Sequence, residues 1–289
     1  MPVAPFTLAE LRTARATGRR LAMLTCYDYT TATLLDRAGI PMLLVGDSAS
    51  GVILGHPSTL PIKLDFLIEL TAAVRRGAPS AMVIGDMPFG SYHTLGSQAI
   101  DNVCRMIKES GCDVVKMEVS EAHLELVKIL SQSGVAVMAH LGLRPQAVGL
   151  TGYKSQGRTV DEASHILRQS QAFARAGAVG LLLEAVPAEV GQRVVEETDV
   201  PVIGCGAGPA CHGHVVVLQD LLRQTPRQPK FVPRIELKAD LIENARAYVK
   251  MIESGEYPAA EHGYTMPEDQ RRLFLRDPAN GAPSDPAIV

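Results

Sequence analysis

Short apolar runs that end in an ionisable residue recur along this chain, and they constrain its fold more than any other feature. One run, Met-Leu-Leu-Val-Gly at residues 42–46, leads directly into Asp47. Apolar residues at successive positions predict a strand buried on both faces, as parallel sheets require. Similar runs end at Asp86, Glu118, His140 and Glu184. We therefore expect a parallel sheet that carries its chemistry at the strand ends.

Segments with helical patterns separate these runs, which predicts repeated βαβ units. About eight units fit within the 289 residues. We expect an α/β fold, a (β/α)8 TIM barrel forming a single domain over residues 1–289, with its core at about 21–254. A helix over 6–20 would close the bottom of the barrel, and 255–289 would form a surface tail. The last unit is predicted as a strand within 214–222 and a helix over 235–253. An open doubly wound sheet is the alternative.

Composition excludes several classes of function. The net charge is −3 and tryptophan is absent, which argues against nucleic acid as a partner. No apolar run reaches the roughly 18 residues that would cross a membrane, and the start of the chain lacks a basic segment followed by an apolar one. Five irregularly spaced cysteines indicate reduced thiols. We expect a cytoplasmic protein with no membrane partner.

Three carboxylates would meet at the mouth of such a barrel, namely Asp47, Asp86 and Glu118. Carboxylates in one pocket repel one another unless a positive charge lies among them, and a hard divalent cation supplies it. Mg²⁺ fits best, since it takes one or two protein carboxylates and fills its other positions with water and substrate. The alternative is that each carboxylate merely caps the following helix.

Other ionisable residues follow the same strands. Lys116 shares a strand face with Glu118, so it can contact a substrate carboxylate or carbonyl, or form a structural ion pair with Glu118. His140 is either a core residue or part of the rim. Glu184 follows three leucines, and apolar surroundings raise the pKa of a carboxyl group, which suits a general base. Its alternative is a buried carboxylate held by a backbone amide or a lysine.

Glycine-rich segments suggest further contacts. The loops over 49–64 and 141–159 are longer than plain connections require, so we expect them to be functional. Residues 204–208, Gly-Cys-Gly-Ala-Gly, lack the third glycine of a dinucleotide fingerprint because position 209 is proline. Tight packing or a phosphate-like pocket remain as interpretations. Cys205 is interpreted as a packing residue rather than a nucleophile.

The sequence also resembles a known family, the ketopantoate hydroxymethyltransferases of the phosphoenolpyruvate/pyruvate barrel superfamily. The resemblance runs from about residue 6 to the Glu-His pair at 261–262. The motifs that carry it lie at 24–28, 45–48, 55–61, 73–78, 86–89, 115–118, 140–143, 152–154, 156–158 and 204–208. One departure occurs at 211–214, where Cys-His-Gly-His replaces an Asp-Gly-Gln type segment.

The resemblance implies a one-carbon transferase. It would move a hydroxymethyl group from 5,10-methylenetetrahydrofolate to 3-methyl-2-oxobutanoate, giving 2-dehydropantoate for pantothenate and coenzyme A synthesis through a magnesium-stabilised enolate. It also implies a homo-oligomer, typically a decamer of two five-membered rings.

The resemblance also assigns roles to residues of this chain. Asp47, Asp86 and Glu118 would form the metal site, with Asp47 and Asp86 also facing the substrate. Ser48, Lys116 and His140 would contact the keto acid, and Glu184 would accept the proton. A magnesium-dependent lyase or aldolase acting on a pyruvate-like acid, or a keto-acid-binding barrel without turnover, are the alternative functions.

Overall fold

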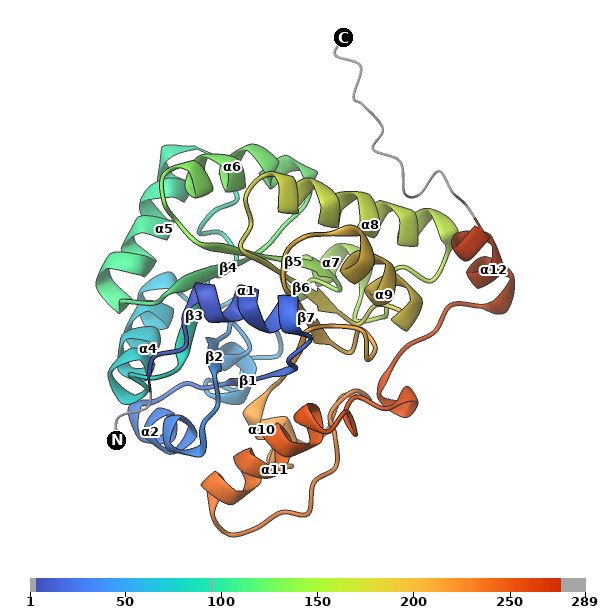
Figure 1. Cartoon of the computed structure of the whole chain (residues 1–289). Coiled ribbons are helices and arrows are strands. Elements are labelled where there is room, and N and C mark those ends of the chain that lie inside the picture. The colour runs from blue at the N-terminus through green and yellow to red at the C-terminus, as the bar shows by residue number, and fades with distance from the viewer. Residues whose placement is uncertain (1–3, 95, 277–289) are drawn as a thin grey trace.

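Eight parallel strands close into a barrel in the computed structural model, which describes residues 4–94 and 96–276 (Figure 1). Each strand pairs with its neighbours along the chain, and the first pairs with the last. The strands are β1 (Leu21–Thr25), β2 (Met42–Val45), β3 (Met82–Asp86), β4 (Val114–Glu118), β5 (Val137–Gly142), β6 (Gly180–Glu184), β7 (Val202–Cys205) and β8 (Gly213–Val216). The predicted (β/α)8 barrel is confirmed, and the open doubly wound sheet is wrong.

Helices alternate with these strands and cover the outside of the barrel (Figure 1). The longer ones are α1 (Leu8–Thr17), α2 (Tyr29–Ala38), α4 (Leu64–Gly77), α5 (Ser97–Ser110), α6 (Leu124–Gln132), α8 (Val160–Arg175), α9 (Ala188–Glu197), α11 (Leu241–Glu253) and α12 (Glu268–Arg276). Short turns of helix are α3 (Ala49–Val52), α7 (Val148–Thr151), α10 (Leu218–Leu221), η1 (Glu121–His123), η2 (Pro145–Ala147) and η3 (Ala260–His262). Helix α11, which was predicted over 235–253, begins at Leu241 rather than residue 235, because Asp240 caps it by accepting the backbone N–H of Ile242.

Helix α1 lies across one end of the barrel, as predicted (Figure 1). Thr7 and Glu10 form a capping box, in which each side chain accepts the other residue's backbone N–H. Leu11 and Ala14 belong to the same buried cluster as the inward-facing residues of the strands. The helix therefore closes the bottom of the barrel with apolar side chains.

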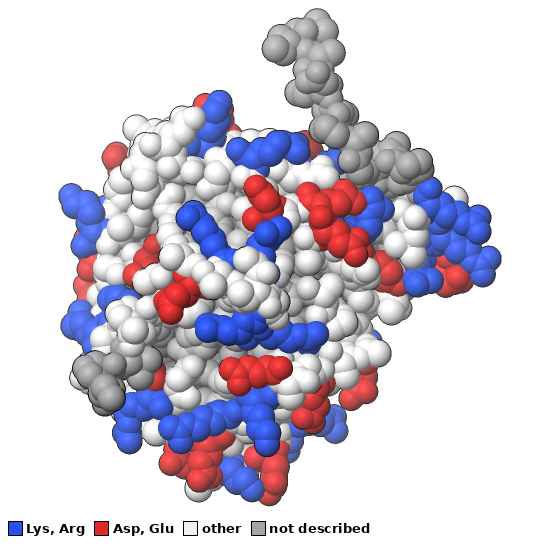
Figure 2. All heavy atoms as spheres, viewed as in Figure 1, with Lys and Arg blue, Asp and Glu red and all other residues white. Residues whose placement is uncertain are grey.

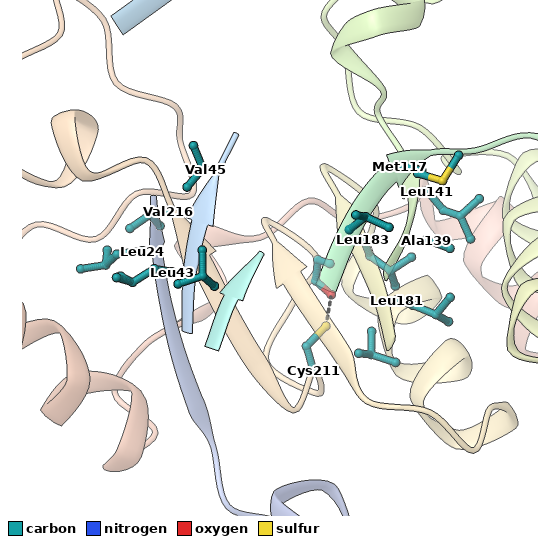
Figure 3. Close-up of a cluster of buried hydrophobic side chains, with 14 of the residues drawn as sticks. Leu24, Leu43, Val45, Met117, Ala139, Leu141, Leu181, Leu183, Cys211 and Val216 are labelled. Atoms are coloured by element: carbon teal, nitrogen blue, oxygen red, sulfur yellow. Dashed lines mark hydrogen bonds between the residues drawn. The ribbon is translucent and has the colours of Figure 1, made fainter. Parts of the chain in front are cut away.

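Strand periodicity divides the core into two clusters. Alternate side chains point to opposite faces, so Met23 and Met42 lie in the cluster inside the barrel. Leu24 and Leu43, one residue further on, belong to the cluster between the strands and the helices (Figure 3). The register Met23↔Met42 and Leu24↔Leu43 aligns these faces from strand to strand. Any inward-facing residue near the carboxyl end of a strand must therefore line the open mouth.

The segment after α11 packs on the barrel as far as the structure describes it. Tyr257, Met266 and Phe274 are buried, and the Tyr257 hydroxyl donates to the carbonyl of Phe231. Helix α12 lies beside α8 (Figure 1). Residues 277–289 of the predicted tail lie outside the described residues, so the boundary between core and tail stays a prediction. Among the described residues, no helix combines the length and apolar character needed to cross a membrane.

The glycines at 204–208 serve close packing. Helix α9 approaches this segment so closely that a Cβ on Gly191 would overlap the Ala207 carbonyl oxygen. Gly208 lies in the left-handed region at φ +83°, where a Cβ would fall 2.6 Å from the Cβ of Ala188. Across the segment, the Cys211 thiol contacts the Ala207 carbonyl (Figure 3). Of the two interpretations of this motif, tight packing agrees with these contacts.

We predict that Gly191→Ala destabilises the fold by about 1–3 kcal/mol, because the methyl group must push α9 away from residue 207. The urea midpoint of unfolding measures the loss. Gly149→Ala is the matched control, since a Cβ there meets nothing within 4 Å. Equal midpoints for the two variants would contradict the packing argument.

Candidate active site

The predicted site residues converge on one cavity at the mouth of the barrel. Asp86, Lys116, Glu118, His140 and Glu184 continue the inward-facing rows of their strands, above the apolar side chains of the lower barrel. The strand register places Asp86 opposite Lys116, and Glu118 opposite His140. The cavity has a volume of about 150 Å³, and Asp47 and Ser48, which follow β2, also line it. Helix α1 thus closes one end of the barrel interior, and ionisable side chains line the other end.

Lys116 forms a buried ion pair with Asp86. The two atoms, Lys116 Nζ and Asp86 Oδ2, lie 2.7 Å apart, and the backbone N–H of Asp47 donates to the same oxygen at 3.0 Å. Burial opposes the charge on Lys116, but the carboxylates of Asp86, Asp47 and Glu118 outweigh it and raise the lysine pKa. Lys116 is thus a fixed cation. The predicted alternative, an ion pair with Glu118, is wrong, since the partner is Asp86.

Gln146 connects two of the carboxylates, although it was not among the residues predicted for the site. Its backbone N–H donates to Glu118 Oε2 at 2.9 Å, and its side-chain Nε2 donates to Asp47 Oδ2 at 3.0 Å. The buried Tyr92 hydroxyl lies 2.9 Å from Gln146 Oε1 and holds the amide in this orientation. Gln146 lies in the long loop that we expected to be functional, but nothing in the residue type distinguishes it from other loop amides.

The carboxylates do not cap helices. Helix α3 begins after Ser48, α5 after Gly96 and η1 after Ser120, and no Asp47, Asp86 or Glu118 side chain accepts an N–H in these caps. The capping alternative is therefore wrong for these three residues. By contrast, Asp28, which also follows a strand, does cap α2 by accepting the backbone N–H of Thr31.

The carboxylates offer oxygen atoms that a cation could use. Asp86 Oδ1 and Glu118 Oε1 are buried without a hydrogen-bond partner, which is costly unless a ligand satisfies them. Within residues 4–94 and 96–276, no group of three His, Cys, Asp or Glu side chains is arranged to hold a metal ion. Mg²⁺ commonly takes one or two protein carboxylates, so Asp47 and Asp86 fit it and Glu118 would act through a bound water. The metal assignment stays a prediction.

His140 and Glu184 lie together in the cavity, on the neighbouring strands β5 and β6. His140 Nε2 is 3.4 Å from Glu184 Oε2, and His140 Nδ1 is 3.8 Å from Glu118 Oε1. Burial lowers the pKa of His140 well below its ordinary value, so the imidazole is neutral. Burial raises the pKa of Glu184 to about 7, although Lys116 opposes the shift. A carboxyl group that titrates near neutral pH is suited to accept a proton.

Ser48 and Cys205 also line the active-site cavity. The Ser48 hydroxyl lies 2.7 Å from the Tyr27 hydroxyl, which fixes Ser48 at the rim. Cys205 lies opposite Glu184 in the strand register, and burial raises the pKa of its thiol well above the ordinary value. A protonated thiol is a poor nucleophile, in agreement with our interpretation of Cys205 as a packing residue.

Residues 212–214 of the departure lie at the far end of the barrel from these groups, and Cys211 packs on the segment after β7. Gly213 begins β8 and pairs with Leu21 at the start of β1. His212 Nδ1 accepts the backbone N–H of Val202, and His214 is buried against Tyr257. These residues therefore belong to the packing at the amino-terminal ends of the strands and leave the carboxylates of the mouth unchanged.

Comparison with known proteins adds to this geometry. A profile for the family described as ketopantoate hydroxymethyltransferase matches residues 5–260. The proteins named 3-methyl-2-oxobutanoate hydroxymethyltransferase from Desulfotalea psychrophila and Geobacillus kaustophilus are 42% and 41% identical to this chain. The first alignment covers 94% of this chain and 98% of the relative, and the second covers 88% and 92%.

Solved structures share the fold at lower identity. Phosphonopyruvate hydrolase in complex with oxalate and Mg²⁺ has a TM-score of 0.54 and 14% identity, covering 87% of this chain and 99% of the other. 2,3-Dimethylmalate lyase, a PEP mutase/isocitrate lyase superfamily member, has a TM-score of 0.55 and 16% identity, covering 88% and 98%.

We predict that Lys116→Met destabilises the protein by about 3–5 kcal/mol at neutral pH, because it leaves Asp86 buried without its counter-charge. Urea unfolding gives the value. Lys128→Met is the control, since Lys128 is 52% exposed in its pair with Glu125 and should change stability by less than about 1 kcal/mol. An unfolding midpoint for Lys116→Met that equals the control value would show that the pair is not a structural requirement.

Proposed function

This chain belongs to the ketopantoate hydroxymethyltransferase family and is therefore an enzyme that transfers a hydroxymethyl group to 3-methyl-2-oxobutanoate, and we propose that the barrel mouth is its active site. The observation that carries the proposal is the convergence of the Lys116–Asp86 pair and Glu184 on one small cavity. The product, 2-dehydropantoate, belongs to pantothenate biosynthesis. We further propose that 5,10-methylenetetrahydrofolate donates the one-carbon unit.

The proposed substrate contacts follow from the charges in the cavity. The Lys116 ammonium is positioned to attract the keto acid's carboxylate or carbonyl oxygen, and the Ser48 hydroxyl can donate to the same end of the substrate. Asp47 and Asp86 would hold Mg²⁺, with Glu118 acting through water. When bound, Mg²⁺ would supply a Lewis acid that withdraws electron density from the keto oxygen. Neutral His140 would contact the substrate beside Glu184.

Glu184 is the proposed base. Its carboxylate accepts the proton from C3 of the keto acid, and the electron pair of that C–H bond shifts toward the keto carbonyl to give an enolate. The enolate carbon then forms the new C–C bond with the methylene carbon of the folate. One water supplies the hydroxyl oxygen of the product. Both bonds between the methylene carbon and the folate nitrogens break. The two nitrogens become N–H groups by taking up the C3 proton and the second proton of the water.

The alternative functions are less well supported. The curated relatives that align over most of this chain are named as hydroxymethyltransferases, which favours transfer over lyase or aldolase chemistry. A barrel that binds a keto acid without turnover disagrees with the same names. The lyase and hydrolase structures at 14–16% identity show the fold alone.

We also propose the partners and the location of the protein. Small molecules rather than nucleic acid or a membrane are the proposed partners, since basic and acidic side chains are interspersed on the face with α1 (Figure 2). We propose that the protein forms a homo-oligomer, and the family resemblance implies a decamer. Its interfaces would cover exposed apolar side chains such as Leu273 and Leu275 of α12. A cytoplasmic location is supported by five cysteines that are all free thiols.

We predict that Glu184→Gln abolishes both 2-dehydropantoate formation and exchange of the C3 hydrogen of the keto acid with deuterated water, because an amide cannot accept the proton. In the unmodified enzyme, the exchange rate should rise with pH and level off above about 7, since only the carboxylate form of Glu184 is a base.

Glu125→Gln, an exposed change on α6, is the control for the Glu184 variant and should retain the wild-type rate and pH profile. Measured exchange in the Glu184→Gln variant at the control rate would remove Glu184 from its proposed role. So would a wild-type profile without an inflection near neutral pH.

We predict that Mg²⁺ raises the thermal midpoint of the wild-type protein by several degrees, because binding to the folded state alone stabilises it. Asp86→Asn should lose most of this rise, while Asp161→Asn, in the first turn of α8, should keep it. Differential scanning fluorimetry across a Mg²⁺ titration makes the measurement without turnover. An Mg²⁺-dependent rise of equal size in the Asp86 variant would contradict the proposed ligand.

A further inference from the structure

A second cavity adjoins the active site and shares Glu118 with it. Its volume is about 260 Å³, against about 150 Å³ for the active-site cavity. Three connecting segments line it, those that follow β3, β4 and β5. Its lining includes Phe89, Tyr92, His93, His123, Arg144 and Leu150. We call this cavity the His93–His123 pocket.

Aromatic rings form one wall of the His93–His123 pocket. The His93 ring lies 4.7 Å from Phe89 and 4.5 Å from Tyr92 between ring centroids, and His123 lies 5.4 Å from Tyr92. Phe89 is 46% exposed and Leu150 is 91% exposed, although both are large apolar side chains. Tyr92 is buried behind the two histidine rings, so Phe89 and the histidines are the aromatic groups that a ligand can meet. Aromatic rings and exposed apolar groups beside a catalytic cavity are typical of a site for a planar ligand.

Hydrogen-bond donors line the same pocket. His93 Nδ1 accepts the backbone N–H of Gly90, and His123 Nδ1 accepts that of Ser120. A neutral imidazole that accepts at Nδ1 carries its proton on Nε2, so both rings present an N–H donor. Burial lowers the pKa of both histidines, which favours this neutral form. Arg144 uses one guanidinium N–H for the carbonyl of Val119 and adds positive charge to the pocket.

Size and position distinguish this pocket from other cavities. The active-site cavity can hold a small keto acid but not a folate, which is several times larger. A larger cavity of about 530 Å³ lies beside Lys230 and Val232, whereas Pro229 and Phe231 of the same segment line the active site. That cavity therefore lies on the opposite side of the segment and shares no lining residue with the active site. The His93–His123 pocket shares Glu118.

We propose that the His93–His123 pocket binds the pterin head of the reduced folate, stacking it on the aromatic wall and donating hydrogen bonds from His93 and His123 to its carbonyl and ring nitrogens. This inference rests on the proposed function, in which the donor is a folate. The one-carbon unit bridges a ring nitrogen of the pterin and the neighbouring nitrogen of the folate's linker, so the pterin site must reach the keto acid. A pocket that meets the substrate cavity at Glu118 satisfies that requirement.

The test uses the double variant His93→Asn/His123→Asn in the full chain. The Asn side-chain oxygen can replace Nδ1 as the acceptor for Gly90 and Ser120, so the loops keep their hydrogen bonds while both Nε2–H donors are lost. The matched control is His165→Asn on α8, whose side chain is 48% exposed and lies outside the pocket. A second variant, Phe89→Ala, removes part of the aromatic wall at a half-exposed position.

The first measurement is the Kd of tetrahydrofolate by calorimetry, which requires no turnover. We expect the double variant to bind tetrahydrofolate at least about tenfold more weakly, as the loss of two hydrogen bonds implies, and Phe89→Ala to bind it several-fold more weakly. The second measurement is exchange of the keto acid's C3 hydrogen, which tests Glu184 and the substrate cavity and should stay at the control rate.

An unchanged tetrahydrofolate Kd in both the double variant and Phe89→Ala would overturn this pocket while leaving the proposed function intact. Failure of the wild-type enzyme to bind tetrahydrofolate would instead refute the folate donor, and this inference with it. If Glu184→Gln loses C3 exchange and the pocket variants keep it, proton removal belongs to the active-site cavity and not to the His93–His123 pocket, as proposed.

Discussion

The buried contact between Lys116 and Asp86 sets the electrostatics of the whole barrel mouth, because a fixed positive charge there lets several carboxylates lie in one cavity. Without it, Asp47, Asp86 and Glu118 would repel one another in a region with little water to screen them. The ammonium lies 2.7 Å from Asp86 and also attracts Asp47 and Glu118, which together keep it charged despite burial. The cost of burying these groups is offset within the cluster, and the cavity is left with charge directed at a substrate.

A hydrogen-bonded scaffold around that ion pair fixes the carboxylates. Gln146 reaches both Glu118 and Asp47, and Tyr92 orients Gln146. These contacts join loops that follow three different strands, so the mouth behaves as one preorganised unit. Catalysis by a positioned base and fixed charges requires such rigidity, since small displacements of reacting groups slow the reaction strongly.

Two cavities of different character meet at Glu118. The smaller one is charged and suits a keto acid, whereas the larger one is aromatic and suits a planar heterocycle. Glu184 and His140 lie on the side of the smaller cavity, where apolar surroundings raise the pKa of the acid and lower that of the histidine. The division assigns proton removal to the barrel strands and donor binding to the connecting loops, as parallel-barrel enzymes commonly arrange it.

The sequence by itself determined the barrel and most of its rim. Apolar runs of strand length, separated by helical segments, permit few arrangements other than parallel βαβ units, and a residue just beyond each run must lie at the carboxyl end of the sheet. Asp86, Lys116, Glu118, His140 and Glu184 were found in this way, and Lys116 was correctly placed on the same strand face as Glu118.

Only the tertiary structure decided which of these groups touch. The partner of Lys116 is Asp86 on the neighbouring strand, because the register sets those two residues side by side. The contacts of Gln146 and Tyr92 and the grouping of the two histidines in the second pocket likewise depend on how distant loops fold back on the mouth. Such contacts join residues far apart in the chain, so local sequence patterns do not predict them. The burial of a strand, by contrast, follows from the apolar character of its own residues.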